Sequence, residues 1–242
     1  MQDWKQAFGL AKFELRESKG SLILVLLFFL FLCSYFRSSL PSYLENGFVG
    51  YDFFFVLVFS VAAFWAKPKE FQISKINSSL QVSRLLMTQS QLPIKRDVLV
   101  KSRFIIHFFY SFPYQVLLLL LLYAFTPDLS QLLPLGSYTA FSIIWLSFGI
   151  YTGYVFPMSE AGDKTGLTTA AIIAYCIVFL VITFFVFAFI HFLFGNGIVY
   201  WSIVFAQKWP LLSSVISLFL AFFGFKHWQY YMNKAMEKID YL

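Results

Sequence analysis

The sequence predicts an all-α integral membrane protein with six transmembrane helices. Three observations lead to this fold class. Of the 242 residues 60% are hydrophobic, only 12% are charged, and long apolar stretches recur along the whole chain. A soluble globular protein has about 25% charged residues, so this chain lacks the polar side chains that would cover a surface in water. Residues 1–242 are therefore expected to form a single transmembrane domain.

Helices of about 20 mostly apolar residues can cross the hydrocarbon core of a bilayer. This length selects six spans, at about 21–39, 48–66, 104–125, 138–158, 167–194 and 211–228. The fifth stretch is long enough to be tilted or broken. The residues ahead of the first span include three acidic side chains, which a signal peptide avoids, so the first span is expected to be retained.

Lysine and arginine residues indicate the orientation in the membrane. All of the 18 except Arg37 and Lys208 lie on one side of the predicted membrane. Because cytoplasmic loops are enriched in these residues, both termini and the loop between spans two and three are placed in the cytoplasm. We expect a multi-pass protein of a bacterial cell membrane. The same asymmetry explains the net charge of +6 by contact with anionic lipid, so no nucleic-acid partner is expected.

Residues 1–20 are expected to form an interfacial helix. Their apolar side chains recur at steps of three and four residues, at Trp4, Ala7, Phe8, Ala11 and Leu15. Such a stripe would lie in the lipid headgroup region while the basic residues face water. Gly20 would then let the chain turn into the first span. The alternative is a frayed cytoplasmic tail.

The loop at 67–103 is too long to be a simple connector. Its first part has the apolar stripe of a partly amphipathic helix, at Phe71, Ile73, Ile76, Leu80, Leu85 and Leu86. Pro93 should end this helix, because proline disfavours helical geometry in the residue before it. Asp97 should then lie in the first turn of the next helix, where the helix dipole favours a negative charge.

The helix ahead of Pro93 is expected to expose Leu85, Leu86 and Leu92 to the cytoplasm. Exposed apolar side chains on a short helix are typical of a docking element. The alternative is that the loop only anchors the third span through its positive charges. That function would not require the leucines.

The sequence contains no recognisable motif for catalysis or nucleotide binding. The loop at 156–166 contains Gly-Asp-Lys-Thr, but a phosphate-binding loop requires glycine at the place of Asp163. The ionisable residues inside the spans, Asp52, His107 and His191, lie near the predicted membrane edges, where interfacial solvation accounts for them. We therefore expect no enzyme activity, metal or cofactor in this chain.

The six spans, the interfacial helix and the long basic loop together resemble the membrane subunit of ABC-2-type ABC exporters. The most specific similarity lies ahead of span three, in Leu92-Pro93-Ile94-Lys95-Arg96-Asp97-Val98-Leu99-Val100-Lys101. This stretch is similar to the leucine–proline–aliphatic pattern, followed by polar and aliphatic residues, that the family has at this place. The family often has serine or threonine where Lys95 stands here, which leaves the start of the third span open.

The resemblance implies a permease subunit without ATPase activity. A coupling helix would contact a separate ABC ATPase subunit through Leu85, Leu86, Gln89, Leu92, Pro93, Ile94, Lys95 and Arg96. A second cytoplasmic contact would come from Ser159, Glu160, Asp163 and Lys164. ATP and magnesium would bind in that ATPase. Two permease subunits would assemble in the membrane, either two copies of this chain or this chain and a paralogue.

The resemblance also implies export of a drug, an amphipathic peptide or a lipid-linked polysaccharide. Phenylalanine is frequent in spans two and five, and a cargo cavity would be lined by Phe54, Phe55, Phe184 and Phe185. The alternative is that these rings face lipid or pack between helices. Because the predicted outer loops are short, a peptide or a hydrophobic small molecule is favoured over a polysaccharide.

Two other functions stay open at the level of sequence. The chain could be an immunity or sensor protein that binds a toxic peptide without transporting it. It could also be a membrane processing enzyme, such as a protease or a lipid transferase. Such an enzyme would need polar groups that converge inside the spans, and the sequence offers few. An adjacent ATPase gene would favour the exporter.

Overall fold

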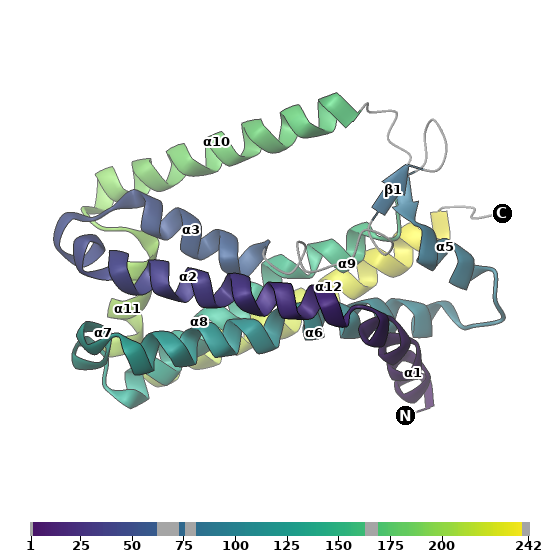
Figure 1. The fold of residues 1–242 in the computed structure, drawn as a ribbon, viewed down its shortest axis with the longest axis horizontal. Coiled ribbons are helices and arrows are strands. Elements are labelled where there is room, and N and C mark those ends of the chain that lie inside the picture. The colour runs from purple at the N-terminus through teal and green to yellow at the C-terminus, as the bar shows by residue number, and fades with distance from the viewer. Residues whose placement is uncertain (1, 62–72, 76–80, 163–168, 239–242) are drawn as a thin grey trace.

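The computed structural model describes residues 2–61, 73–75, 81–162 and 169–238, and this part of the chain is almost entirely helical (Figure 1). The helices are α1 (Gln2–Glu17), α2 (Lys19–Asn46), α3 (Val49–Ser60), α5 (Arg84–Ser90), α6 (Arg96–Phe125), α7 (Pro127–Leu132), α8 (Leu135–Gly153), α9 (Val155–Ser159), α10 (Thr169–Phe194), α11 (Ile198–Lys208) and α12 (Pro210–Lys238). A two-stranded antiparallel hairpin precedes α5, formed by β1 (Ile73–Lys75) and β2 (Gln81–Ser83).

Five of the described helical segments are long and apolar enough to cross a membrane, namely Lys19–Asn46, Arg96–Phe125, Leu135–Ser159, Ile173–Phe194 and Pro210–Lys238. The fold is therefore consistent with the all-α membrane protein that the composition predicts. The second predicted span, 48–66, is described only as far as Val61. Its helix α3 has 12 residues, about 18 Å at 1.5 Å per residue. This is shorter than a bilayer core of roughly 30 Å, so the span predicted at 48–66 stays a prediction.

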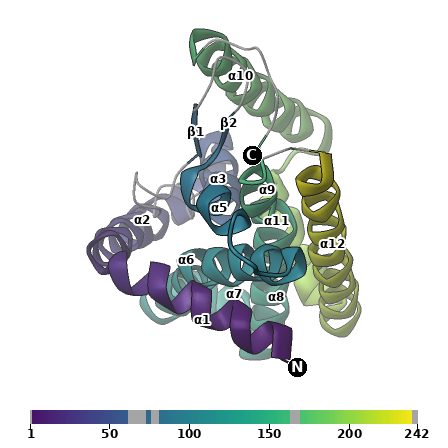
Figure 2. The same cartoon turned by 90° about the vertical axis from the view of Figure 1, so that its right-hand side faces the viewer.

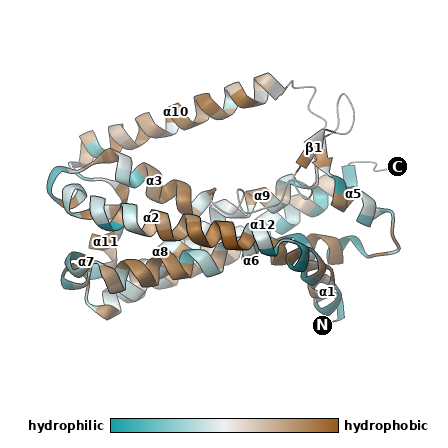
Figure 3. Cartoon of the chain, in the orientation of Figure 1, coloured by the Kyte–Doolittle hydropathy of each residue, from teal (hydrophilic) through white to brown (hydrophobic). Residues whose placement is uncertain are grey.

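The two ends of the bundle carry different elements. α1, β1, α5 and the end of α12 lie at one end, here called the α5 end, and α7 and α11 lie at the other, the α11 end (Figure 1). α2, α6 and α10 run away from the α5 end, and α3, α8 and α12 run back toward it. Hydrophilic residues gather at both ends, and hydrophobic residues predominate between them (Figure 3). A bilayer around the middle of the bundle would match this distribution.

An aromatic core holds α2, α3 and α8 together. Phe55 is fully buried, and its ring centroid lies 5.1 Å from Phe36, 5.1 Å from Phe59 and 4.7 Å from Trp145. Tilted and edge-to-face ring pairs of this kind add to the free energy of apolar burial. These contacts fix the position of α3 although the helix is short.

α10 is the least covered of the long helices. It lies beside α3 and away from α1 when the bundle is seen from the α5 end (Figure 2), and other protein atoms bury only 6% of its apolar stretch. The fifth span, for which the sequence allowed a break, is one continuous helix from Thr169 to Phe194. A helix so apolar and so little covered is expected to face lipid.

The hairpin corrects the helix predicted for the first part of the long loop. Ile73 pairs with Ser83 in an antiparallel register, so the described residues of this stretch are strands. Ile73 and Val82 are β-branched, which favours strands over helices. Only Leu85 and Leu86 of the predicted stripe lie on a helix, and three of its residues lie outside the described part of the chain, namely Phe71, Ile76 and Leu80.

The turn from α1 into α2 also differs from the prediction. The chain turns at Ser18, and Gly20 lies inside α2. Ser18 is buried, and its hydroxyl donates a hydrogen bond to the carbonyl of Glu14 at 2.7 Å. The Ser18 N–H donates to the same carbonyl at 3.1 Å, so both groups of Ser18 bind the last turn of α1.

Candidate functional site

α5 and the residues that follow it form a helix, a break and a second helix at the α5 end. α5 stops at Ser90, residues 91–95 are not helical, and α6 begins directly after them. Pro93 lies in the break, and Asp97 lies in the first turn of α6, where its carboxylate complements the helix dipole. Both placements confirm the prediction. Asp97 also accepts a hydrogen bond from Lys101 at 2.9 Å, which supports this first turn.

The inner side of α5 packs against the bundle. Leu86 is 0% exposed, in an apolar cluster that includes Val82, Phe104, Tyr154 and Met232. These partners come from β2, α6, the junction of α8 with α9, and α12. The expectation that Leu86 is exposed is therefore wrong, because α5 packs on α6 with Leu86 directed into this cluster.

Gln89 continues the inner side of α5. Its side-chain oxygen accepts a hydrogen bond from Arg103 at 2.8 Å, and both side chains are buried. Residues 86 and 89 are three apart and so share one helix face. The resemblance implies that Gln89 would contact an ATPase, whereas in the structure it faces α6.

Arg103 is the centre of a buried polar cluster, with 1% of the residue exposed. Its Nη1 donates to the Glu14 carboxylate at 2.7 Å and lies 3.6 Å from the Glu160 carboxylate, while Nη2 donates to Gln89. The four residues, here called the Arg103 cluster, come from α1, α5, α6 and the end of α9. A planar guanidinium holds such partners in defined directions. One side chain thus joins four elements.

The Arg103 cluster makes a stiff connection. Removing one partner from a buried ion pair costs about 3–5 kcal/mol, because the other charge is left without compensation. A displacement of α5 that keeps the cluster intact must therefore also move α6, α1 and the end of α9. The arrangement can transmit a displacement from the short helix to the long ones.

The outer side of α5 and the break is more accessible. Leu92 is 51% exposed, in agreement with the prediction. Pro93, Lys95 and Arg96 are also exposed, and Leu85 and Ile94 are half-buried. Together with Leu92, these five residues are here called the outer group. The residues predicted to contact an ATPase thus divide into this outer group and a buried inner pair, Leu86 and Gln89.

The two basic residues of the outer group form salt bridges at the surface. Lys95 lies 3.5 Å from Asp3 of α1, and Arg96 lies 3.3 Å from Glu237 of α12. Exposed ion pairs contribute from almost nothing to about 1 kcal/mol. The acidic residues of an approaching partner can therefore replace Asp3 and Glu237 in these ion pairs at little cost in free energy.

The predicted second contact is only partly described. Ser159 is half-buried, and its hydroxyl donates to the carbonyl of Phe156 at 2.7 Å. Glu160 is 7% exposed and belongs to the Arg103 cluster, so its carboxylate faces the interior. Asp163 and Lys164 lie outside the described residues.

The four phenylalanines predicted to line a cargo cavity lie in different surroundings. Phe55 is buried in the aromatic core, whereas Phe54, Phe184 and Phe185 are exposed. The ring of Phe184 lies against Phe53, with 5.7 Å between the centroids. In the described structure, one of the four therefore packs between helices and the other three lie on the surface.

A second buried polar cluster lies at the α11 end. Asp52 is 1% exposed, and its Oδ1 accepts hydrogen bonds from the Val199 N–H at 2.7 Å and from the Tyr43 hydroxyl at 2.9 Å. The Tyr43 hydroxyl accepts in turn from the Tyr200 N–H at 2.9 Å. Backbone N–H groups in the first turn of a helix lack partners within that helix. Asp52 and Tyr43 therefore cap α11, and interfacial solvation is the wrong account of Asp52.

Glu14 and Arg103 were not singled out by the sequence. Glu14 shares one face of α1 with Ala7 and Ala11, and both alanines are fully buried. A charged residue on a face of small residues was the available signal. Arg103 was counted with the basic residues of the loop, where nothing in its neighbourhood distinguishes it from Lys101.

The Arg103 cluster offers a structural connection between elements. Among the described residues, no group of three or more histidine, cysteine, aspartate or glutamate side chains is arranged to hold a metal ion.

Comparisons of the chain with known protein families, with curated proteins and with solved structures give no match.

Proposed function

We propose that this chain is the membrane-spanning permease subunit of an ATP-driven ABC exporter of the ABC-2 type. A separate cytoplasmic ABC ATPase binds ATP and magnesium, and α5 with the outer group is the coupling helix that contacts it. Two permease subunits complete the transporter, either two copies of this chain or this chain and a paralogue. The cargo is an amphipathic peptide or a hydrophobic small molecule that leaves the cell.

The observation that supports this proposal is the two-sided character of α5. Its inner side is tied to three other elements through Gln89 and Arg103. The break directly after α5 and the start of α6 present the exposed Leu92, Lys95 and Arg96. A short helix that is exposed on one side and stiffly connected on the other suits the transfer of motion from a partner. The positive charge of the outer group favours a partner surface with acidic residues.

The mechanism follows the contacts of the Arg103 cluster. Closure of the ATPase around ATP displaces α5, and Gln89 passes this displacement to Arg103, two turns into α6. Glu14 and Glu160 carry it to α1 and to the end of α9. The long helices then shift relative to one another and open a path for the cargo. ATP hydrolysis in the partner resets the arrangement.

Co-purification tests the proposal. The tagged chain is expressed with each stand-alone ABC ATPase of the same genome and purified in a mild detergent. The unchanged chain is expected to retain one of these ATPases. A triple variant, Leu92→Gln with Lys95→Glu and Arg96→Glu, alters only exposed residues. It is expected to weaken binding by about tenfold or more, since a loss of roughly 1.4 kcal/mol is sufficient for that.

Matched charge reversals provide the control. Lys12→Glu on α1 and Lys208→Glu on α11 also alter exposed lysines, and both variants are expected to keep the ATPase. If the triple variant binds the ATPase as well as the unchanged chain does, α5 is not a coupling helix. If no ABC ATPase stays with the unchanged chain, an immunity or sensor function without transport replaces the exporter.

A further inference from the structure

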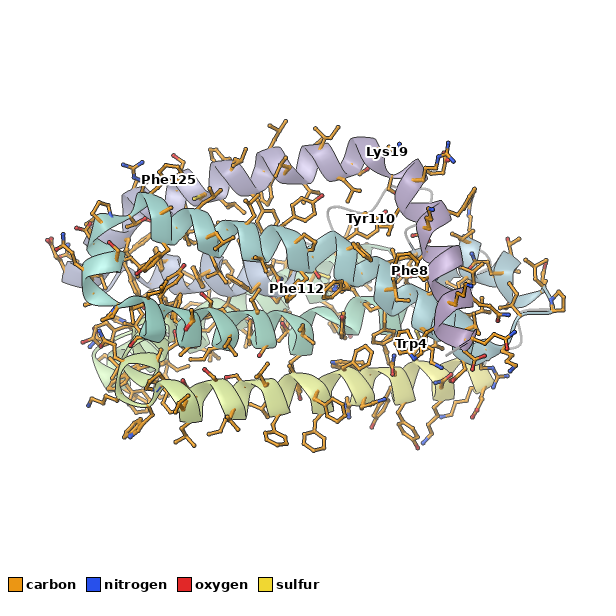
Figure 4. The ribbon with its side chains drawn as sticks, turned by 90° about the horizontal axis from the view of Figure 1, so that it is seen from below. Trp4, Phe8, Lys19, Tyr110, Phe112 and Phe125 are labelled. Atoms are coloured by element: carbon orange, nitrogen blue, oxygen red, sulfur yellow. The ribbon has the colours of Figure 1, made fainter. Side chains whose placement is uncertain are left out.

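Two neighbouring cavities at the α5 end share Trp4 as a wall. The first has a volume of about 380 Å³ and is almost entirely aromatic, with Phe8, Phe104, Phe109 and Phe225 among its lining residues. Figure 4 shows Trp4 and Phe8 on α1, where this helix crosses α6 toward α12. The walls are packed among themselves, since the rings of Phe104 and Phe225 lie 5.7 Å apart. This cavity suits a hydrocarbon chain.

The second cavity, of about 360 Å³, is polar. Its lining includes Asp97, Lys101, Lys226 and Asn233, together with Trp4. The Lys101 Nζ lies 5.5 Å from the centre of the Trp4 ring, within the range of a cation–π contact. The Lys226 Nζ lies 6.0 Å from the ring of Phe225, which lines the apolar cavity. Both ammonium groups thus border the boundary between the two cavities.

The charges of the polar cavity leave an excess of positive charge. Asp97 accepts hydrogen bonds from Lys101 at 2.9 Å and from Asn233 at 3.4 Å. This carboxylate balances one of the two lysines that line the cavity. One positive charge is left to attract an anion, beside a cavity that is lined by aromatic rings. The combined site is therefore complementary to a molecule with an anionic head and an apolar tail.

We propose that this site binds one anionic phospholipid from the membrane leaflet at the α5 end. The acyl chain lies in the aromatic cavity, and the phosphate lies near Lys101 and Lys226. Tryptophan is enriched at the headgroup level of membranes, which agrees with Trp4 at the boundary. The lipid would fill the junction of α1, α6 and α12. This inference requires that the chain lies in a membrane, but it does not depend on the exporter proposal.

Quenching of Trp4 fluorescence by brominated lipids tests the site. The protein is placed in nanodiscs of unlabelled phosphatidylcholine. In one series an increasing fraction of the lipid is phosphatidylglycerol brominated on the acyl chain, and in the other it is phosphatidylcholine brominated in the same way. The Trp4 signal is the difference between the unchanged chain and Trp4→Phe, because the chain has six tryptophans. Half-maximal quenching is expected at about fivefold lower mole fraction for brominated phosphatidylglycerol, the preference expected from one lysine near an anionic headgroup.

Lysine variants complete the experiment. Lys226→Gln leaves the pair of Lys101 with Asp97 in place and is expected to abolish most of the preference for phosphatidylglycerol. The double variant Lys226→Gln with Lys101→Gln is expected to abolish this preference completely. Lys12→Gln with Lys234→Gln removes two exposed lysines that line neither cavity, and is expected to keep the preference. Equal quenching by the two brominated lipids in the unchanged chain overturns the proposal. So does a preference that survives in Lys226→Gln and in the double variant.

Discussion

Arg103 is a charged side chain in a place from which protein atoms exclude water. A buried charge is tolerated only where hydrogen-bond partners replace its solvent. Here the partners are the carboxylates of Glu14 and Glu160 and the amide of Gln89. Because each partner belongs to a different element, this single residue fixes the relative positions of α1, α5, α6 and the end of α9.

Loss of the Arg103 side chain is expected to destabilise the protein strongly. Arg103→Ala should lower the free energy of unfolding by about 3–5 kcal/mol, because it leaves the carboxylates of Glu14 and Glu160 buried without their cation. Thermal unfolding of the purified protein in detergent measures the change. Arg96→Ala is the matched control. It removes an exposed pair with Glu237 and should cost less than about 1 kcal/mol. Equal effects of the two variants would contradict the described cluster.

The contact between Glu14 and Arg103 could not be predicted from local sequence. The two residues are 89 positions apart, and helical periodicity relates only residues on one helix. Asp97 could be predicted because the helix dipole and Pro93 act within a few residues of it. Asp52 was misassigned for a similar reason, since its partner Val199 lies 147 positions along the chain.

Leu86 lies in α5 and Leu92 in the break that follows it, and substitutions of these two leucines should differ sharply in their effect on stability. Leu86→Ala removes a fully buried side chain and should cost about 2–5 kcal/mol of unfolding free energy. Leu92→Ala alters an exposed side chain and should change it by about 0.5 kcal/mol or less. Thermal unfolding in detergent compares them. A Leu92 variant as unstable as the Leu86 variant would show that the outer group is packed against the bundle.

The order of helix, break and helix around Pro93 was predictable, whereas the hairpin ahead of it was not. Proline removes helical geometry locally, so its effect can be inferred from one residue. A strand requires a partner strand, and Ile73 fits both a helical stripe and an alternating pattern when its partner is unknown. The buried side of α5 was also unpredictable, because both sides carry leucines and only packing on α6 distinguishes them.

At the scale of the whole molecule, the arrangement of the helices predicts which positions face each side of the membrane. In a variant without Cys33 and Cys176, single cysteines replace exposed lysines at the two ends of the bundle. Lys12→Cys, at the α5 end, is expected to react with an impermeant maleimide only after the cells are opened. Lys208→Cys, at the α11 end, is expected to react in intact cells. The reverse pattern would contradict the orientation inferred from the basic residues.

Most of the span pattern could be read from the sequence, because the length of an apolar stretch is a local property. The predicted boundaries were too narrow where polar residues extend a helix beyond the membrane. α2 continues to Asn46 and α12 to Lys238, well past the predicted ends of spans one and six. Which of the four phenylalanines lie on the surface could not be predicted, since the side of a helix that each ring faces depends on the packing of its neighbours.

Site-specific photo-crosslinking in the native host tests whether the outer group contacts an ABC ATPase. A photoreactive amino acid is placed at Leu92 in the outer group, at the buried Leu86, or at Lys208 at the opposite end. Position 92 is expected to form a covalent product with an ABC ATPase, identified by mass spectrometry, and positions 86 and 208 are expected not to. Crosslinks from position 92 that reach only lipid or the chain itself, or an ATPase captured equally from position 208, would contradict a coupling role for α5.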